Sequence, residues 1–391
     1  MRRGTKIQKL KQALPGIVKD VRHYAKPRVK LHNEGLGDYY TEGYRSLNQR
    51  EWKGVRDTAY DFASWLKVYG YMAVTLGKHP VALTKSFVRY PWMASYLTVA
   101  NMLDRHKLGL RGKQLRYTQE QFYGVVHNSV DVIAKIIERD ENLNSPNNKR
   151  AAKLRAKTVM FDEMTPSIIM AGFPMLDWID IAMSPVCLPG EVDQNANIMY
   201  VDAAERMGLA ADVCPLPSAE VGCAIVDDYP QVGSSFITSS MPCDGSLGAA
   251  LFMDRYMKKL PSFTLTPPQR FNEPETNAYA VKDLKNCIRF IEETYHVKWD
   301  WDAFWEKAEE YNKTTQCMLD KWDVNCTPYP QVIGSALSLQ REYEFQTAAC
   351  LDPFMTKQDE KVTKMMLKGY EKDREADRRD YKYRAIVWCC P

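Results

Sequence analysis

The sequence predicts an α/β fold with a parallel sheet, and three observations support this prediction. Short apolar or β-branched runs alternate with longer segments in which apolar residues recur at helical spacing. Two short runs are each followed by a cysteine, Cys214 or Cys243, and then by a segment that begins like a helix. The last apolar run, 381–387, follows a long charged segment of helical pattern. Alternating strands and helices are typical of a parallel sheet covered by helices.

Residues 1–150 precede this pattern and differ from it. Residues 1–50 form a basic N-terminal arm, whose first 30 residues hold ten Lys or Arg and one acidic residue. We interpret the arm as a solvated or docking segment. Residues 51–150 form a helical accessory domain, in which the last apolar stretch, 122–137, has helical spacing. The polar segment 142–155 is expected to be a linker to the next domain.

Residues 151–355 are predicted to form the α/β domain. Strands are expected at residues 158–161, 209–213, 234–241 and 262–265, with a further element at 175–183. Helices are expected to begin at residue 166 and to run over residues 196–207, 275–295 and 299–322. The helix at 275–295 should bury Cys287, and Gly208 should cap the helix at 196–207. These elements predict a Rossmann/flavodoxin-like parallel sheet domain with a helical N-terminal layer.

Residues 356–391 are predicted to begin a second α/β domain. The charged segment 357–380 is expected to be an exposed helix, and residues 381–387 a strand. No helix follows that strand before Pro391, and a strand without its crossover is an incomplete βαβ unit. We therefore expect the second α/β half to be truncated at the C-terminus.

Composition and charge argue against several classes of protein. With 45% hydrophobic and 26% charged residues, the composition is that of a globular protein. No apolar run reaches the ~18 residues of a membrane-spanning helix, and the N-terminus lacks the apolar core of a signal peptide. We therefore expect a cytoplasmic protein with no membrane span. Outside the arm, basic residues are not interleaved with aromatic ones, so no nucleic-acid partner is expected.

Motifs for several common catalytic chemistries are absent from the sequence. It contains no Walker A loop, no GxGxxG and no HExxH. The chain itself is therefore not expected to hydrolyse ATP, to bind a dinucleotide by the usual loop or to act as a zinc protease. Its six histidines are scattered, and all but His296 precede the α/β domain.

Cys214 and Cys243 are the candidate ligands of a metal cofactor. Each stands where a strand is predicted to end and a helix to begin, and open α/β sheets hold cofactors at that edge. The first turn of a helix also stabilises a thiolate. Their separation, 243 − 214 = 29 residues, suits one ligand from each of two neighbouring βα units rather than a CxxC motif. Such spacing fits an iron–sulfur cluster better than a structural zinc site. The alternative is two core thiols, as we expect for most of the ten cysteines.

Four landmarks in the chain resemble one family. They are ADVCPLPSAEVG around Cys214, SSMPCDGSLGAA around Cys243, YHVKWD from Tyr295, and the C-terminal YRAIV. In this order, over residues 152–391, they resemble the 2-hydroxyacyl-CoA dehydratase and benzoyl-CoA reductase family, in particular its D-component members. The resemblance implies that Cys214 and Cys243 bind a 4Fe-4S cluster beside an acyl-CoA thioester.

The same resemblance implies a reaction and partners. Such a subunit is part of an anaerobic lyase that eliminates water from an (R)-2-hydroxyacyl-CoA through a ketyl radical. The electron comes from an ATP-dependent iron–sulfur activator protein, and the subunit acts as a heterodimer with a homologous second subunit. Glu163 and Thr165 are the catalytic candidates near the acyl-CoA carbonyl, while helix capping is the alternative role of Thr165. Residues 327–351 correspond to the substrate-facing helical region.

The third cysteine of the family has no counterpart within residues 1–391. Cys187, in the loop SPVCLPGE, is either a substitute ligand or an ordinary loop thiol. Two alternative functions therefore stay open. One is a benzoyl-CoA reductase-type subunit that reduces an aromatic or other acyl-CoA, and the other is a non-catalytic or truncated partner subunit without a cluster.

Overall fold

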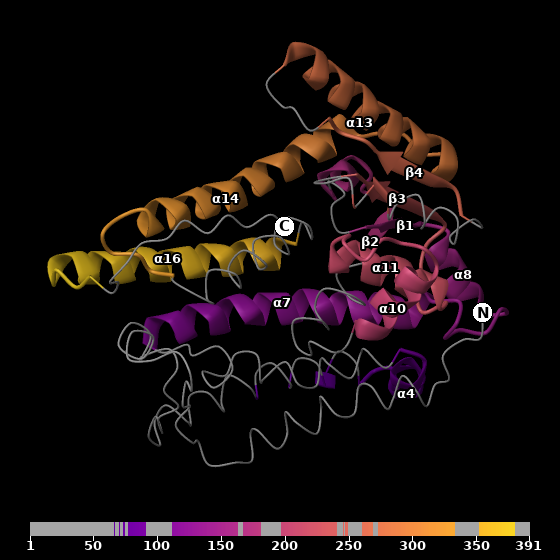
Figure 1. Ribbon diagram of the computed structural model, residues 1–391, viewed down its shortest axis with the longest axis horizontal. Helices are drawn as coiled ribbons and strands as arrows, with labels where there is room; N and C mark the ends of the chain where they lie inside the picture. Colours follow the sequence, from indigo (N-terminus) through magenta and orange to yellow (C-terminus); the bar gives the residue numbers. More distant parts are fainter. Residues whose placement is uncertain are drawn as a thin grey trace. The chain divides into compact units, whose positions relative to one another are not determined.

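The computed structural model describes part of the chain in detail. The described residues are 66, 70, 73–74, 77–90, 112–162, 167–180, 197–240, 245, 247–248, 260–268, 273–332 and 352–379. They fall into two compact units (Figure 1). The first unit contains the described residues between Thr75 and Thr98 and between Ser129 and Lys307. The second contains residues 66, 70 and 73–74, those between Val99 and Asn128, and those from Ala308 onward. Helices α7 (Gly112–Arg139) and α14 (Trp301–Asn325) therefore contribute to both units.

Four short parallel strands form the sheet of the first unit. They are β1 (Thr158–Phe161), β2 (Asp177–Asp180), β3 (Ser235–Ser239) and β4 (Ser262–Leu265). Their order is β2-β1-β3-β4, with Val159 of β1 opposite Ser235 of β3. Every residue of β1 and β3 is buried, as expected for central strands of a parallel sheet. The α/β prediction is therefore confirmed, and β1 and β4 have the predicted bounds.

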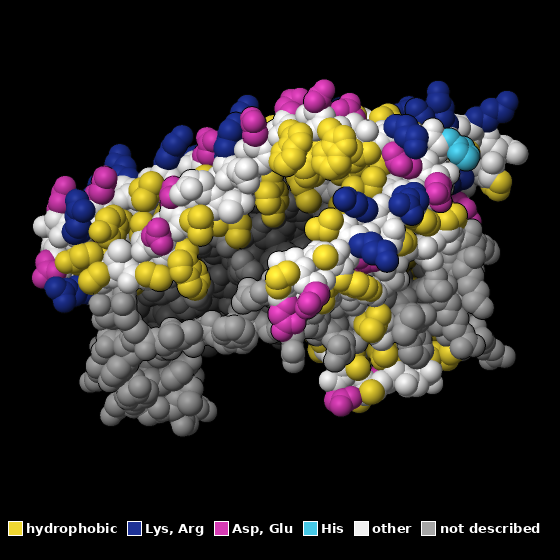
Figure 2. Space-filling view, turned by 90° about the horizontal axis from the view of Figure 1, so that it is seen from above, with side chains coloured by type: hydrophobic (Ala, Val, Ile, Leu, Met, Phe, Trp, Pro, Cys, Tyr) yellow, Lys and Arg dark blue, Asp and Glu magenta, His cyan; other side chains and the backbone are white. Residues whose placement is uncertain are grey.

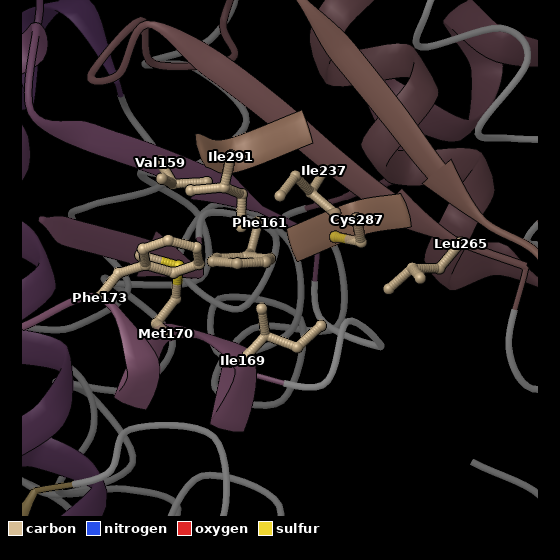
Figure 3. Packing of buried hydrophobic residues seen from close by; sticks show 9 residues of the cluster. All are labelled: Val159, Phe161, Ile169, Met170, Phe173, Ile237, Leu265, Cys287 and Ile291. Carbon is tan, nitrogen blue, oxygen red and sulfur yellow. The ribbon is translucent and has the colours of Figure 1, made fainter. Parts of the chain in front are cut away.

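A hydrophobic core lies between the sheet and helix α13 (Pro274–Tyr295). Figure 3 shows its nine buried side chains pointing toward one another. They come from three strands, from the 3-10 helix η2 (Ser167–Gly172) with the adjoining Phe173, and from α13. Cys287 of α13 is fully buried, as predicted, and burial raises the pKa of its thiol to about 12. The expected helix from residue 166 is this short 3-10 helix, which the structure describes from Ser167.

Helices α10 (Ile198–Arg206) and α11 (Pro215–Ile225) lie side by side in the first unit (Figure 1). A Cβ atom on Gly222 would lie 1.7 Å from the carbonyl oxygen of Tyr200, so a glycine is required where the two helices meet. After α11, Tyr229 contacts Phe236 of β3, with ring centroids 5.9 Å apart. Because side chains alternate along a strand, Phe236 and the core residue Ile237 face opposite sides of the sheet. The residues that follow α11 therefore cover the face that α13 does not.

The strand expected at 209–213 is not present, and this prediction was wrong. Gly208, with φ of +100°, ends α10 as predicted, in a Schellman motif. In this motif Gly208 N donates to the carbonyl of Glu205, and Leu209 N donates to that of Ala204. Leu209 is thus used to close α10, and the next residues, 210–212, are exposed in a turn that leads to α11.

The segment expected to be a linker, 142–155, contains helix α8 (Lys149–Arg155). Asn148 caps it, since its side-chain oxygen accepts a hydrogen bond of 3.1 Å from Ala151 N. This part of the chain is therefore ordered within the first unit. The domain boundaries that we expect from composition stay a prediction.

In the second unit, α16 (Pro353–Glu375) packs through one face. Met355, Val362 and Met366 are fully buried, and Asp359 forms a fully buried ion pair with Lys321 of α14. The helix is confirmed, but the expectation that it is exposed was wrong. The many charged residues of this segment predicted an exposed helix, but part of that charge is paired inside the unit, as in the ion pair of Asp359 with Lys321.

None of the helices in the described part of the chain is long and apolar enough to cross a membrane.

Candidate functional site at the carboxyl edge of the sheet

The carboxyl ends of the four strands lie along one edge of the sheet, because the strands are parallel. In the sheet order β2-β1-β3-β4, the strand that follows β1 in sequence lies toward one edge of the sheet, and the strand that follows β3 lies toward the opposite edge. The order in which strands are added therefore reverses between β1 and β3. Open α/β sheets bind ligands outside the carboxyl ends of the strands at such a switch point. This position defines the candidate site.

Asp162 links the ends of β1 and β3 at this edge. It follows β1 directly, its N–H donates to the carbonyl of Ile237 at 3.1 Å, and its Oδ2 accepts a hydrogen bond of 3.2 Å from Ser239 N. On the other side of β3, Ser240 N donates to the carbonyl of Leu265 at 2.8 Å. The last residues of β3 are therefore held from both sides, and Asp162 is only 8% exposed.

A buried tyrosine in the segment between α11 and β3 is hydrogen-bonded to α11 and is influenced by the charge of Asp162. Tyr229 donates a hydrogen bond of 2.9 Å from its hydroxyl to Oε1 of Glu220, which lies on α11. Burial, followed by the negative charges of Glu220 and Asp162, raises the pKa of Tyr229 well above its ordinary value. The hydroxyl therefore stays protonated and acts as a donor. The arrangement places carboxylates from a helix and from a strand end around one phenol.

Cys214 is the N-cap residue of α11, and its side chain makes no capping hydrogen bond. It is exposed, and Ser218 donates a hydrogen bond of 2.9 Å to its carbonyl rather than to its sulfur. Cys214 lies 220 − 214 = 6 residues before Glu220, about 9 Å along the helix axis at 1.5 Å per residue. An exposed thiol at a helix N-terminus is chemically suited to bind a metal. Cys223, on the same helix, is fully buried, as predicted.

The other predicted site residues are not placed by the structure. Cys243, Glu163 and Thr165 lie outside the described residues, and so does Cys187. Among the described residues, no group of three or more His, Cys, Asp or Glu side chains could hold a metal ion.

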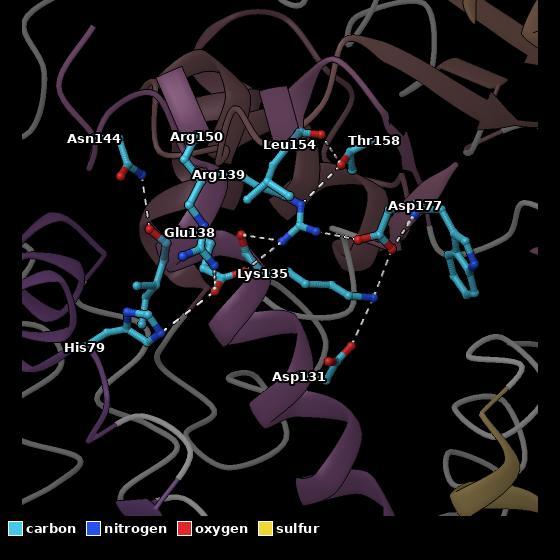
Figure 4. Close-up of polar contacts among 12 residues, drawn as sticks. His79, Asp131, Lys135, Glu138, Arg139, Asn144, Arg150, Leu154, Thr158 and Asp177 are labelled. Carbon is cyan, nitrogen blue, oxygen red and sulfur yellow. Dashed lines mark hydrogen bonds and ion pairs between the residues drawn. The ribbon is translucent and has the colours of Figure 1, made fainter. Parts of the chain in front are cut away.

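The amino end of the sheet is held by ion pairs from α7 (Figure 4). Arg139 forms an ion pair with Asp177 of β2 and donates to the hydroxyl of Thr158 at 3.2 Å. Lys135 lies between Asp131, at 3.0 Å, and Asp177, at 3.3 Å. Burial alone would lower the pKa of Lys135, but the two carboxylates outweigh it and raise the pKa. Polar contacts thus fix both ends of the sheet, and those at the amino end are partly buried.

Comparison with known protein families gives the identity of this part of the chain. A model of the 2-hydroxyglutaryl-CoA dehydratase, D-component family matches residues 192–391. The chain belongs to this family. The matched segment of this D-component family member includes Cys214, Cys243, Glu220 and Tyr229, whereas β1 and Asp162 precede it. No curated protein matches the chain.

The sequence of this D-component family member did not lead us to three residues of the site, Asp162, Glu220 and Tyr229. Asp162 carries a signal that could have been used, because it is a polar residue directly after a buried strand at the sheet edge. Glu220 and Tyr229 carry none, since their contact joins a helix to a loop nine residues away. Their pairing is visible only in three dimensions.

Proposed function

We propose that the chain is the iron–sulfur subunit of a 2-hydroxyacyl-CoA dehydratase. The observation that carries this proposal is the match to the D-component family over residues 192–391, a segment that contains both Cys214 and Cys243. The reaction is the elimination of water from an (R)-2-hydroxyacyl-CoA through a ketyl radical. The electron is supplied by an ATP-dependent activator, and activity requires a homologous partner subunit.

The position of Cys214 supports a role as a cluster ligand. Its thiol is exposed at the N-terminus of α11 and is not used in capping, so it is available to a metal. Cys243 follows the last residue of β3 by 243 − 239 = 4 residues, a length of chain that spans at most about 14 Å. Cys214 is thus directly attached to α11, and Cys243 is separated from the end of β3 by a short stretch of chain. We also propose that its sheet is the core of a Rossmann/flavodoxin-like domain.

In this proposal Cys214 and Cys243 hold a 4Fe-4S cluster. When bound, the cluster supplies one-electron chemistry and an open iron for a substrate oxygen. The chain's own contribution is to position the ligands: Asp162 holds the end of β3, and Glu220 with Tyr229 ties α11 to the rest of the unit. Glu163 and Thr165 remain candidates for contact with the acyl-CoA carbonyl.

Iron analysis of the anaerobically purified chain tests the cluster. We expect about four irons per chain, together with sulfide, and an EPR signal after reduction. Cys214→Ala and Cys243→Ala should each remove at least half of the iron. Cys326→Ala is the matched control, because Cys326 is also exposed but lies just beyond α14. Equal iron in Cys214→Ala and Cys326→Ala, or no iron after anaerobic reconstitution, would contradict the proposal and favour a non-catalytic partner without a cluster.

The reaction itself is tested with substrates. The chain would be combined with its homologous partner subunit, an activator and ATP, and supplied with an (R)-2-hydroxyacyl-CoA. We expect the corresponding 2-enoyl-CoA as the product. Conversion of benzoyl-CoA to a reduced ring, without dehydration of the hydroxyacyl-CoA, would instead assign the chain to the benzoyl-CoA reductase type.

A further inference from the structure

A row of aromatic side chains runs from the core of the first unit to its surface. Phe173 is fully buried and contacts Trp299, with ring centroids 5.3 Å apart. Trp299 contacts Trp301 at 5.4 Å, and Trp301 stacks on Trp305 at 6.4 Å with an angle of 26° between the rings. Phe304 touches all three tryptophans. The outer members of the row are therefore held in place by the inner ones.

Trp301 and Trp305, at the start of α14, lie at the surface. Their exposed fractions are 56% and 60%, high values for the largest apolar side chain. Figure 2, which views the molecule from the side of α13 and α14, shows hydrophobic side chains gathered between charged ones. Exposed and rigidly held tryptophans are typical of interaction surfaces, where they act as anchors at a small entropic cost.

Two acidic side chains lie next to the two tryptophans on helix α14. Asp302 lies one turn before Trp305 on the helix surface, and Glu306 lies one turn after Asp302. Both acids are exposed, and neither forms an ion pair with any described residue. The nearest basic residues along the chain are Lys307, which is half-buried, and Lys298, whose exposed side chain pairs with Glu292 at 3.5 Å. The surface therefore combines apolar rings with negative charge.

We propose that this surface docks the basic arm of the chain, residues 1–30. The arm lies outside the described residues, and its sequence complements the surface in two ways. Its ten Lys or Arg against one acidic residue match the negative charge of Asp302 and Glu306. Basic side chains also bind to the faces of tryptophan rings, and apolar residues of the arm such as Leu10 and Ile17 can pack against them. This inference goes beyond the proposed function and does not depend on a cluster.

Photo-crosslinking in the full-length chain tests the docking. The photoreactive aromatic residue p-benzoylphenylalanine is incorporated at Trp305 and, as the matched control, at Trp322. Trp322 is 63% exposed and lies on the same helix, outside the aromatic row. After irradiation, crosslinked peptides are identified by mass spectrometry. We expect crosslinks from position 305 to residues 1–30 to be at least about five times as abundant as those from position 322. Crosslinks that are equally abundant from both positions, or that lead to other segments or to another protein, would overturn the proposal.

A charge-reversal series separates docking from chance proximity. Asp302→Lys with Glu306→Lys should lower the crosslinks from position 305 at least about fivefold, because the arm is then repelled. Adding Lys9→Glu and Lys11→Glu should restore most of them. Yields that do not respond to these changes would also overturn the proposal. A mixture of isotopically light and heavy chains shows which chain supplies the arm. We expect crosslinks within one chain, and crosslinks found only between chains would overturn docking of the chain's own arm.

Discussion

Gly222 of α11 lies so close to Tyr200 of α10 that a Cβ atom would sit 1.7 Å from the Tyr200 carbonyl oxygen. We therefore expect Gly222→Ala to force the two helices apart and to lower the free energy of unfolding by about 1–3 kcal/mol. Urea unfolding followed by circular dichroism measures this loss. Gly248→Ala is the control, because no atom lies within 4 Å of an added Cβ there. Equal stability of the two variants would contradict the close contact.

Tyr229→Phe tests the contact between α11 and the segment that leads from it to β3. The variant keeps the ring and removes the hydroxyl that donates to Glu220, so we expect a loss of about 1 kcal/mol in the free energy of unfolding. Tyr279→Phe is the matched control, since the hydroxyl of Tyr279 is paired with Thr266 at an exposed site. If both variants unfold at the same urea concentration, the buried contact contributes nothing.

The ion pair of Lys321 and Asp359 should respond differently to single and double substitution. Both side chains have 0% exposure, so Lys321→Met leaves a carboxylate buried without its cation. We expect the single variant to lose about 3–5 kcal/mol of unfolding free energy. The double variant Lys321→Met/Asp359→Leu should recover most of that loss, because both desolvated charges are gone. A double variant as unstable as the single one would show that packing, not charge, is responsible.

Cys287 should make the stability of the chain depend on alkaline pH. Burial raises its pKa from 9.0 to about 12, so the folded chain keeps this thiol protonated where the unfolded chain ionises it. The stabilising contribution is therefore complete below about pH 9 and is lost as the pH rises toward about 12. Between these values the free energy of unfolding should fall by up to about 1.4 kcal/mol per pH unit from this group.

Cys287→Ala isolates that contribution from those of other groups. The slope of unfolding free energy against pH should be shallower in this variant than in the parent chain. Urea unfolding at a series of pH values measures both slopes. An identical slope in Cys287→Ala and the parent chain would show that the buried thiol does not titrate as its burial requires.

The elements that sequence reasoning located are those with a strong local pattern. β1 is a short apolar run between Lys157 and Asp162, and β4 alternates polar and apolar residues after Pro261. Helix α13 has apolar residues at helical spacing, with Cys287 among them. Residues 209–213 are also mainly apolar, but Leu209 N donates to the Ala204 carbonyl at the end of α10. No local pattern distinguishes a residue that ends a helix in this way from the first residue of a strand. The buried face of α16 was missed for a similar reason, because its acid Asp359 pairs with a lysine 38 residues earlier in the chain.

In the candidate site, too, features with a local sequence signal were predicted and contacts between distant residues were not. The position of Cys214 before a helix was predicted from Pro215 and the pattern that follows, and the structure confirms that α11 begins there. The contact of Tyr229 with Glu220 depends on how the chain returns from α11 to the sheet, which spacing alone does not determine. Local signals therefore locate the ends of elements, while the polar contacts around them depend on tertiary packing.

The aromatic row of Phe173, Trp299, Trp301 and Trp305 also gives the first unit an optical reporter. Indole rings 5.4 and 6.4 Å apart couple electronically, so their circular dichroism and fluorescence depend on the geometry of the whole row. Because the row begins at a fully buried phenylalanine and ends at an exposed tryptophan, one spectrum responds both to unfolding of the core and to events at the surface. The difference spectrum between the chain and its Trp301→Phe variant separates the row from the other six of the nine tryptophans, and it follows this unit in solution without an added label.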